Sequence, residues 1–397
     1  MLNCFFAGQG AQFPGMGKDL AENDPEIMAL FDKANEVLGF DLKTICFEGP
    51  AEALTKSDVC QPAIFTVSMA CYTAFRKQCP DAPAAAMAGL SLGEWTALCA
   101  AGVLDFETTL KILQARGKYM QEACEAKPSG MISIMGATPE QLKAICEGSG
   151  CTVSNINSDA QQVISGTHEA VAKAAELATA EGVKNVVLQV AGAFHSPFMT
   201  PAREKLAEFV KDIPFGKPAV PVLSNATGTF HAEDGEAIKA AMLTQVDSPV
   251  HFSDCVKAVM PNGGIFAEFG PGKVLSGLIR RIDKANAVTN VQDTASLTGS
   301  SRIQVSGEAQ KNETKVASSD YEMEIMSYSS KKGTTSIMIK AIYYPVTGCL
   351  YNYFPNLNGE GTAGIGLSAG DYSVAGTSTS FGVMANSMCF HYIPEAE

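Results

Sequence analysis

Residues 89–93, Gly-Leu-Ser-Leu-Gly, constrain the fold most, because small apolar residues precede them at 84–88 and a helix-prone stretch follows at 94–101. A strand, a sharp turn and a helix form the context of a nucleophile elbow. The glycines would permit the turn, Ser91 would project its hydroxyl, and the backbone N–H of Leu92 would be a candidate oxyanion donor. Since G-x-S-x-G also arises by chance, the alternative is a glycine-flanked helix start that Ser91 merely caps.

A serine nucleophile needs a base, and the chain has five histidines. His195 stands in a turn after an apolar stretch, where an inserted segment would rejoin the body, and we predict that it is the base. The other four have positions that suggest no catalytic role. His168 would start a helix and His231 would lie in a polar loop, whereas His251 would lie at a strand-like edge and His391 in the C-terminal region. The aspartates between Ser91 and His195, Asp105 and Asp159, are unconvincing partners, so a backbone carbonyl is expected to orient the imidazole.

Arg116 lies within a predicted helix over 105–123, with Ile112 and Met120 four residues to either side. Because no acid occupies i±3 or i±4 on that face, the guanidinium emerges among apolar neighbours without a local counter-ion. We interpret Arg116 as an anion-binding residue, since arginine offers a bidentate match to a carboxylate. The alternative is an arginine whose stem packs while its head reaches solvent.

The composition excludes several classes of protein. With 46% hydrophobic and 18% charged residues, the chain of 397 residues can bury a large core. A net charge of -13 argues against a nucleic-acid binder. The twelve cysteines are scattered without a C-x-x-C pair or a histidine at ligand spacing, which predicts reduced core thiols and no metal site.

The N-terminal residues 1–7 are apolar but lack a basic region and a cleavage site, so we predict a first buried strand. No run of eighteen apolar residues occurs, and we therefore expect no membrane contact and a cytoplasmic protein. The glycine-rich runs at 8–13 and 270–274 satisfy neither a dinucleotide fingerprint nor a Walker loop, so we expect no cofactor. The Gly-Gln-Gly turn at 8–10 could instead present N–H groups to an oxyanion.

Tyrosine usage divides the chain near residue 298, because two tyrosines precede this point and eight follow it. The first part alternates alanine-rich helical stretches with β-branched runs, which predicts an α/β fold. Within it the order βαββαβ is predicted from strands at 131–136, 152–157, 162–165 and 185–190 and helices at 139–146 and 168–180. We expect a ferredoxin-like subdomain, residues 129–192, inserted in an α/β-hydrolase-like body of residues 1–128 and 193–297, with a site in the cleft between them.

The C-terminal extension, residues 298–397, is rich in Ser, Thr and Gly. Runs with β propensity at 335–341, 342–346, 350–354 and 381–384 predict a small β-rich module. The alternative is a poorly ordered extension, a gene fusion or a reading-frame artefact.

Taken together, seven motifs in order resemble the malonyl-CoA:acyl-carrier-protein transacylase family of fatty-acid synthesis, over residues 1 to about 297. They are Ala7-Gly-Gln-Gly-Ala-Gln, Gly89-Leu-Ser-Leu-Gly-Glu, Gln114-Ala-Arg-Gly-Lys-Tyr-Met-Gln, Asn157-Ser with Gln162-Val-Ile-Ser-Gly, Ala193-Phe-His-Ser, Gln245-Val-Asp-Ser-Pro-Val and Glu268-Phe-Gly-Pro-Gly-Lys-Val-Leu. Two positions depart from the family: Leu90 stands where it often has His, and Trp95 where Tyr is commoner. Neither change is expected to affect the chemistry.

The resemblance implies a ping-pong transfer in which Ser91 takes the malonyl group from malonyl-CoA, with His195 as the general base. The main-chain carbonyl of Gln245 would orient His195. The carrier protein's phosphopantetheine thiol would then take malonyl from the ester.

The resemblance also assigns residues around the substrate. The backbone N–H groups of Leu92 and Gln9 would form the oxyanion hole, and Arg116 would clamp the malonyl carboxylate. Phe194 is the residue found in malonyl-selective members, where a bulky ring disfavours an α-methyl branch.

The expected partners are malonyl-CoA and acyl carrier protein, with no nucleic acid, and the expected state is a monomer. Basic side chains near the mouth of the site are candidates for binding the acidic carrier protein: Lys118, Lys273, Arg280 and Arg281. Two other functions stay open on the residues alone. One is a serine hydrolase or acyl-thioesterase that uses water as the acceptor, and the other is a non-catalytic binding protein whose C-terminal extension does the work.

Overall fold

The computed structural model describes residues 2–80 and 82–297, and from the remainder only the backbone of short strands between 325 and 382. The chain divides into two compact units, Met1–Pro80 with Ala84–Ser300 and Asp81–Pro83 with Ser301–Glu397. The site residues predicted from the sequence all lie in the first unit. In the part of the chain that is described, no helix is both long and apolar enough to cross a membrane.

A parallel sheet of four strands in the order β2-β1-β7-β8 forms the centre of the first unit. Its strands are β1 (Leu2–Phe6), β2 (Ala84–Gly89), β7 (Ile265–Phe269) and β8 (Val288–Val291). Every residue of β1 is buried, as its apolar sequence predicts for an inner parallel strand. Because parallel strands run in one direction, the segments that follow β1 and β2, at 7–10 and 90–93, meet at one edge of the sheet.

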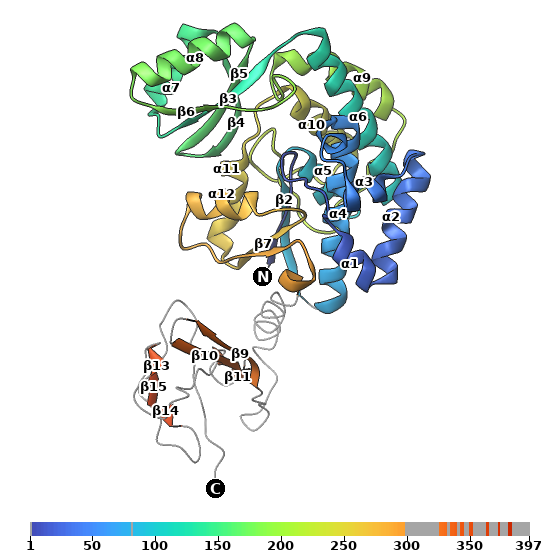
Figure 1. Ribbon diagram of the computed structural model, residues 1–397, viewed down its shortest axis with the longest axis vertical. Coiled ribbons are helices and arrows are strands. Elements are labelled where there is room, and N and C mark those ends of the chain that lie inside the picture. Colours follow the sequence, from blue (N-terminus) through green and yellow to red (C-terminus); the bar gives the residue numbers. More distant parts are fainter. Residues whose placement is uncertain are drawn as a thin grey trace. The chain divides into compact units, whose positions relative to one another are not determined.

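Helices cover both faces of this sheet (Figure 1). Phe5 faces one layer, where it contacts Phe252 of α11 (Phe252–Val259) and packs in one cluster with residues of α12 (Val274–Ile282). Phe6 faces the other layer and contacts Tyr72 of α4 (Ser57–Gln78). On that side lie also α5 (Leu92–Ala100) and α6 (Phe106–Ala126). The alternation of side chains along β1 thus builds two cores, one on each face.

Further helices complete the body. They are α1 (Lys18–Asn23), α2 (Pro25–Leu38), α3 (Leu42–Glu48), η1 (Ala53–Thr55), η2 (Pro197–Met199), α9 (Thr200–Val210), α10 (Gly235–Asp247) and η3 (Met260–Asn262). The predicted helix over 105–123 corresponds to α6, which begins after the capping side chain of Asp105 and ends three residues later than predicted, at Ala126.

An insert between α6 and η2 carries an antiparallel sheet in the order β4-β5-β3-β6. Its elements are β3 (Gly130–Met135), α7 (Pro139–Ser149), β4 (Thr152–Ser158), β5 (Gln161–Gly166), α8 (His168–Ala180) and β6 (Lys184–Val187). Ile132 and Ile164 pack against α7 and α8. Their neighbours Met131 and Val163 point to the opposite face, which lines a cavity.

Two predicted boundaries in the insert were wrong for identifiable reasons. The helix predicted over 139–146 continues to Ser149: a capping box starts it at Thr138, and Gly150, in the left-handed conformation at φ 79°, caps its C-terminal end. The strand predicted over 185–190 ends at Val187. Residues 188–190 line the cavity instead of continuing the sheet.

The strands described beyond residue 300 are short. β9 (Ile325–Lys331) pairs antiparallel with β10 (Thr334–Ile339), and β11 (Ile342–Tyr344) with β12 (Cys349–Tyr351). The third group, in the order β13-β15-β14, consists of β13 (Ala363–Gly364), β14 (Tyr372–Ser373) and β15 (Ser380–Gly382). All four predicted β runs overlap strands, although each strand is shorter, and β9, β13 and β14 were not predicted. The linker near 298 lies outside the described residues.

Candidate active site

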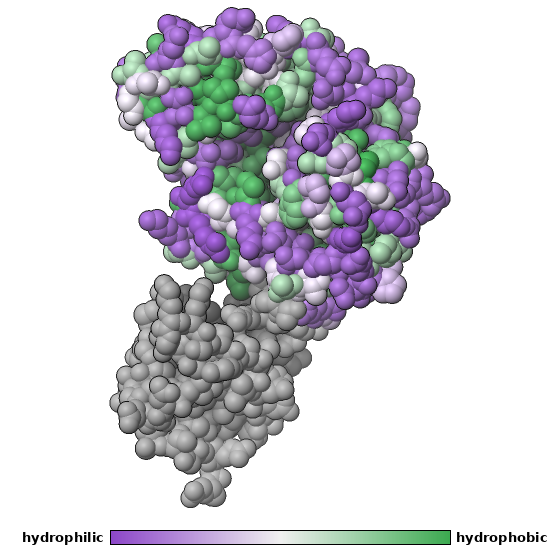
Figure 2. All heavy atoms as spheres, in the orientation of Figure 1, coloured by the Kyte–Doolittle hydropathy of each residue, from purple (hydrophilic) through white to green (hydrophobic). Residues whose placement is uncertain are grey.

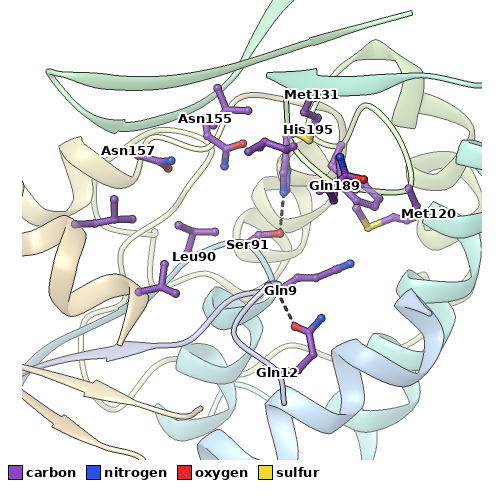
Figure 3. A pocket seen from close by; sticks show the side chains of 18 of the residues that line it. Gln9, Gln12, Leu90, Ser91, Met120, Met131, Asn155, Asn157, Gln189 and His195 are labelled. Carbon is purple, nitrogen blue, oxygen red and sulfur yellow. Dashed lines mark hydrogen bonds between the residues drawn. The ribbon is translucent and has the colours of Figure 1, made fainter. Parts of the chain in front are cut away.

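A cavity of about 790 Å³ lies in the cleft between the body and the insert. The body contributes Gln9, Ser91 and His195 to its lining, and the insert contributes Asn155 and Val163. Figure 3 shows Ser91 and His195 joined by a hydrogen bond, with Asn155 and Asn157 across the cavity. Figure 2 shows apolar surface on both sides of the hollow.

Ser91 occupies the sharp turn between β2 and α5, where its backbone adopts φ 57° and ψ -103°. This region is costly for a residue with a side chain, so the surroundings must hold it in place. The flanking glycines are required sterically. A Cβ on Gly89 would stand 2.0 Å from the carbonyl carbon of Gly93, and one on Gly93 would stand 2.1 Å from the carbonyl oxygen of Phe6. The side chain of Ser91 makes no capping hydrogen bond to α5, which is contrary to the helix-cap alternative.

His195 meets Ser91 from the segment that follows the insert. Its Nε2 lies 2.8 Å from the Ser91 hydroxyl oxygen, and its Nδ1 lies 2.9 Å from the main-chain carbonyl oxygen of Gln245. Because a carbonyl oxygen only accepts, Nδ1 carries the proton and Nε2 is free to accept one from Ser91. Burial, and then the nearby cation of Arg116, lower the pKa of His195 to about 4. The imidazole is therefore a neutral acceptor near neutral pH.

Arg116 is buried beside this pair, with 1% of its surface exposed, so the alternative in which its head reaches solvent is wrong. Nη2 donates to the Ser91 hydroxyl and to the side-chain oxygen of Gln245, both at 3.0 Å. Nη1 donates to the side-chain oxygen of Gln61 at 2.7 Å. Burial lowers the pKa of Arg116 to about 10, which still leaves a cation at neutral pH. A buried cation whose contacts are all neutral is suited to bind an anion.

The backbone N–H groups of Gln9 and Leu92 occupy the edge of the sheet where β1 and β2 end. Among the described residues neither N–H has an acceptor. The two loops approach closely, since the N–H of Leu90 donates to the carbonyl oxygen of Phe6 at 3.3 Å. Both amides are thus available to a negatively charged oxygen.

The remaining predicted residues fall into two groups. Phe194, immediately before His195, is buried and lines the cavity. Lys273 and Arg281 also line it, but both are exposed. Arg280, whose guanidinium donates to the carbonyl oxygen of Val288, and Lys118 are not among the lining residues.

The aspartates considered as partners of His195 do not contact it. Asp105 caps α6, and Asp159 forms an exposed ion pair with Lys257. His195 is oriented by a carbonyl oxygen instead. The described residues contain no group of three or more His, Cys, Asp or Glu able to hold a metal ion.

The sequence reasoning missed a buried carboxylate, Glu94. Its Oε2 accepts from the backbone N–H of Asn225 at 3.0 Å and from Nε2 of Gln245 at 2.6 Å, and its Oε1 lies 2.6 Å from Nε2 of His231. His231 was interpreted as a polar-loop residue, but only 1% of its side chain is exposed. One signal could have found Glu94: it is the one charged residue of the apolar helix α5.

Other histidines take structural positions. His168 is the first residue of α8. His251, predicted at a strand-like edge, instead precedes α11 and pairs with Asp254 at 2.9 Å. His391 lies outside the described residues.

Comparison with known proteins gives one consistent family. The acyl transferase domain model matches residues 4–329. The malonyl CoA-acyl carrier protein transacylase of Bacillus subtilis is 40% identical over 297 residues, which cover 72% of this chain and 92% of that protein. The transacylase of Escherichia coli K12 is 40% identical over 283 residues, 70% of this chain and 91% of that protein.

Solved structures agree with the sequence relatives. The malonyl CoA-acyl carrier protein transacylase of Clostridium perfringens superposes with a TM-score of 0.72 at 38% identity, covering 75% of this chain and 95% of that one. A malonyl-transacylase solved in complex with a type II polyketide synthase acyl-carrier protein gives a TM-score of 0.71 at 36% identity, covering 75% of this chain and 97% of that one.

Proposed function

This chain belongs to the acyl transferase family. We propose that it transfers the malonyl group from malonyl-CoA to the phosphopantetheine thiol of acyl carrier protein and so supplies extender units for fatty-acid synthesis. One observation carries the proposal. The hydroxyl of Ser91 contacts both a neutral imidazole and a buried guanidinium. The first contact supplies a base for acyl transfer, and the second supplies a cation for the free carboxylate of malonate.

In the first half-reaction Ser91 attacks the thioester carbonyl carbon, and its proton passes to Nε2 of His195. The developing oxyanion accepts hydrogen bonds from the backbone N–H groups of Gln9 and Leu92. When the tetrahedral intermediate collapses, the carbon–sulfur bond breaks and CoA leaves as the thiol with the proton from His195. A malonyl ester on Ser91 remains.

The second half-reaction is the same exchange with a different thiol. His195 takes the proton of the phosphopantetheine thiol, whose sulfur attacks the ester carbonyl carbon. The carbon–oxygen bond to Ser91 breaks, and His195 returns the proton to the serine oxygen. Because one thioester is consumed and one is formed, the reaction needs no cofactor.

Arg116 supplies the preference for malonyl. Its hydrogen-bond partners in the site are a hydroxyl and two amide oxygens, so no acid competes directly for its charge. An acetyl group would leave this cation without a counter-ion, whereas the malonyl carboxylate pairs with it. Phe194 on the cavity wall is proposed to disfavour acyl groups with an α-methyl branch.

The transfer function accounts for features that a serine hydrolase does not need. A hydrolase on the same elbow would use water and would not require a buried arginine beside its serine. The relatives are named as transacylases, which favours a thiol as the acceptor. We further propose that the two sheets correspond to an α/β-hydrolase-like body and a ferredoxin-like insert, and that the protein is a cytoplasmic monomer.

Isotope-labelled malonyl-CoA tests the proposal. Wild-type protein should acquire one malonyl group by intact mass and pass it to holo acyl carrier protein. Ser91→Ala should acquire none, because the ester oxygen is absent. Ser253→Ala is a matched control, since that serine is also buried but lies on α11, where its hydroxyl has no partner among the described residues. A malonyl-enzyme that persists in Ser91→Ala would refute the proposal.

A further inference from the structure

The carboxylate of Glu94 lies behind the elbow, three residues after Ser91, and none of its surface is exposed. Burying a carboxylate is costly unless hydrogen bonds satisfy its oxygens. Asn225, Gln245 and His231 supply these contacts from three other segments. Two of the three partners also touch the reacting groups, which a carboxylate that only stabilised the core would not need.

The first connection runs through Asn225 to the strained turn. The carboxylate of Glu94 accepts a hydrogen bond from the backbone N–H of Asn225. The side-chain oxygen of Asn225 in turn accepts a hydrogen bond from the backbone N–H of Ser91 at 2.7 Å. The side-chain nitrogen of Asn225 donates to the carbonyl oxygen of Gly89 at 2.8 Å. Asn225 therefore spans the elbow from Gly89 to Ser91. An unfavourable φ at Ser91 persists only where such contacts fix the turn.

The second connection runs through the side chain of Gln245. Arginine has no acceptor, so the oxygen of this amide must face Arg116 and its nitrogen must face Glu94. The same nitrogen donates to the carbonyl oxygen of Ser91 at 2.9 Å. Glu94 thus lies one amide away from the guanidinium and does not pair with it. Arg116 keeps hydrogen-bonding capacity for a substrate, since its Nε has no partner among the described residues.

His231 closes the remaining side of the carboxylate. Its ring contacts Oε1, while its backbone N–H donates to the carbonyl oxygen of Val222 at 2.8 Å. This histidine fixes the rotamer of Glu94 without touching Ser91, His195 or Arg116.

We propose that Glu94 is a positioning residue that holds the Ser91 elbow and the Arg116 guanidinium in register with each other, an inference that rests on the proposed function. No proton or group is transferred to Glu94. The connection through Asn225 to the elbow and the connection through Gln245 to Arg116 should affect malonyl-CoA and acetyl-CoA differently. The elbow serves any acyl-CoA, whereas the guanidinium serves only an acyl group with a free carboxylate.

Glu94→Gln tests this role in the full-length chain. Glutamine keeps the shape of Glu94 but replaces the charged carboxylate by a neutral amide with one acceptor oxygen, which weakens the charge-assisted hydrogen bonds to Asn225 and Gln245. We expect kcat/KM for acylation by malonyl-CoA to fall about tenfold or more, the usual size of a lost hydrogen bond to a charged group. Acylation by acetyl-CoA should fall less, and the malonyl-over-acetyl ratio should therefore decrease.

Glu268→Gln is the matched control for the loss of a buried carboxylate. Glu268 is equally buried, but it accepts the backbone N–H groups of Leu275 and Ser276 at the start of α12. This variant should lose thermal stability while keeping the malonyl-over-acetyl ratio. In an Arg116→Ala background, Glu94→Gln should leave the ratio unchanged, because contacts that act through one residue are not additive.

The outcomes separate the two proposals. If wild-type protein forms no malonyl-enzyme, the proposed function fails. If wild-type protein is acylated and folded Glu94→Gln keeps the wild-type ratio, only the role of Glu94 fails. Should Glu94→Gln not fold, His231→Leu decides, since it removes the contact that fixes the carboxylate of Glu94 while Glu94, Asn225 and Gln245 all stay in the chain. A lower ratio in that variant supports the role, and a wild-type rate and ratio overturn it.

Discussion

Ser91 and His195 are separated by 104 residues, yet their side chains meet at 2.8 Å and both have a positive φ, 57° and 56°. Within the described residues they are the two non-glycine positions with this backbone conformation. The chain therefore concentrates unfavourable backbone geometry at the two side chains that meet. The N–H of Ser91 donates to the side-chain oxygen of Asn225, and Nδ1 of His195 donates to the main-chain carbonyl oxygen of Gln245; these hydrogen bonds hold the two residues there.

Gly93→Ala should disrupt the elbow. Its Cβ would stand 2.1 Å from the carbonyl oxygen of Phe6 and 2.9 Å from that of Ala7, and backbone atoms cannot yield as a side chain does. We expect a loss of about 3 kcal/mol or more in the free energy of unfolding, with loss of acylation. Denaturant unfolding measures the first quantity. Gly277→Ala is the control for stability, because nothing lies within 4 Å of its Cβ; equal stability of both variants would contradict the steric argument.

Arg116→Ala should impair malonyl transfer selectively. Removing the cation leaves the malonyl carboxylate buried without a partner, at a cost of about 2 to 4 kcal/mol in kcat/KM. Acetyl transfer should be affected less, and the preference should move toward acetyl. Arg116→Lys should be intermediate, since lysine keeps the charge but not the planar fork. Parallel losses for both acyl groups would show that Arg116 does not select the substrate.

The pH dependence of acylation should reflect the environment of His195. Burial and the Arg116 cation lower its pKa from 6.5 to about 4, so the base stays unprotonated well below neutral pH. The acid limb of kcat/KM for malonyl-CoA should therefore lie far below 6.5. The same shift contributes stability that is present above pH 6.5 and is lost as the pH falls toward 4. Circular dichroism at each pH separates the two effects, and an acid limb near 6.5 is the contrary result.

The core cysteines should react slowly with thiol reagents in the native protein. Burial raises the pKa of Cys60, Cys71 and Cys99 to about 12, which keeps them protonated at neutral pH. Denaturant should release these thiols to rapid reaction with an aromatic disulfide reagent. A Cys349→Ser, Cys389→Ser variant removes the two cysteines beyond residue 300 and simplifies the titration. Fast native labelling of Cys60, Cys71 and Cys99 would be inconsistent with their burial.

Ending the chain after residue 297 should preserve malonyl transfer. The residues assigned to the chemistry lie before this point, and the part of the chain that aligns with the Bacillus subtilis transacylase, 72% of this chain, already covers 92% of that protein. The truncated protein should match the full chain in kcat/KM for malonyl-CoA. A large loss of activity with an intact circular dichroism spectrum would assign the C-terminal extension a part in transfer.

Local sequence was sufficient for much of the architecture. The apolar run at the N-terminus predicted β1, and Gly89, Ser91 and Gly93 predicted a strand, turn and helix. The order of strands and helices over 129–192 appears in the structure in the predicted sequence. Errors gathered at element ends, as at Val187, because strand length depends on the neighbouring strand and not on propensity alone. The predicted family membership is confirmed by the match to residues 4–329.

The sequence by itself determined the family and named Ser91, His195 and Arg116, because these residues stand in short motifs whose local order is informative. Only the tertiary structure showed what holds them. Glu94 bonds to Asn225 and Gln245 across 131 and 151 residues of chain. The helix-prone sequence around Glu94 does not indicate these partners, because helix propensity depends on a few neighbouring residues. The hydrogen-bond donors to a buried carboxylate come instead from segments that tertiary packing brings together. Folding therefore decided which amides face the serine and the arginine.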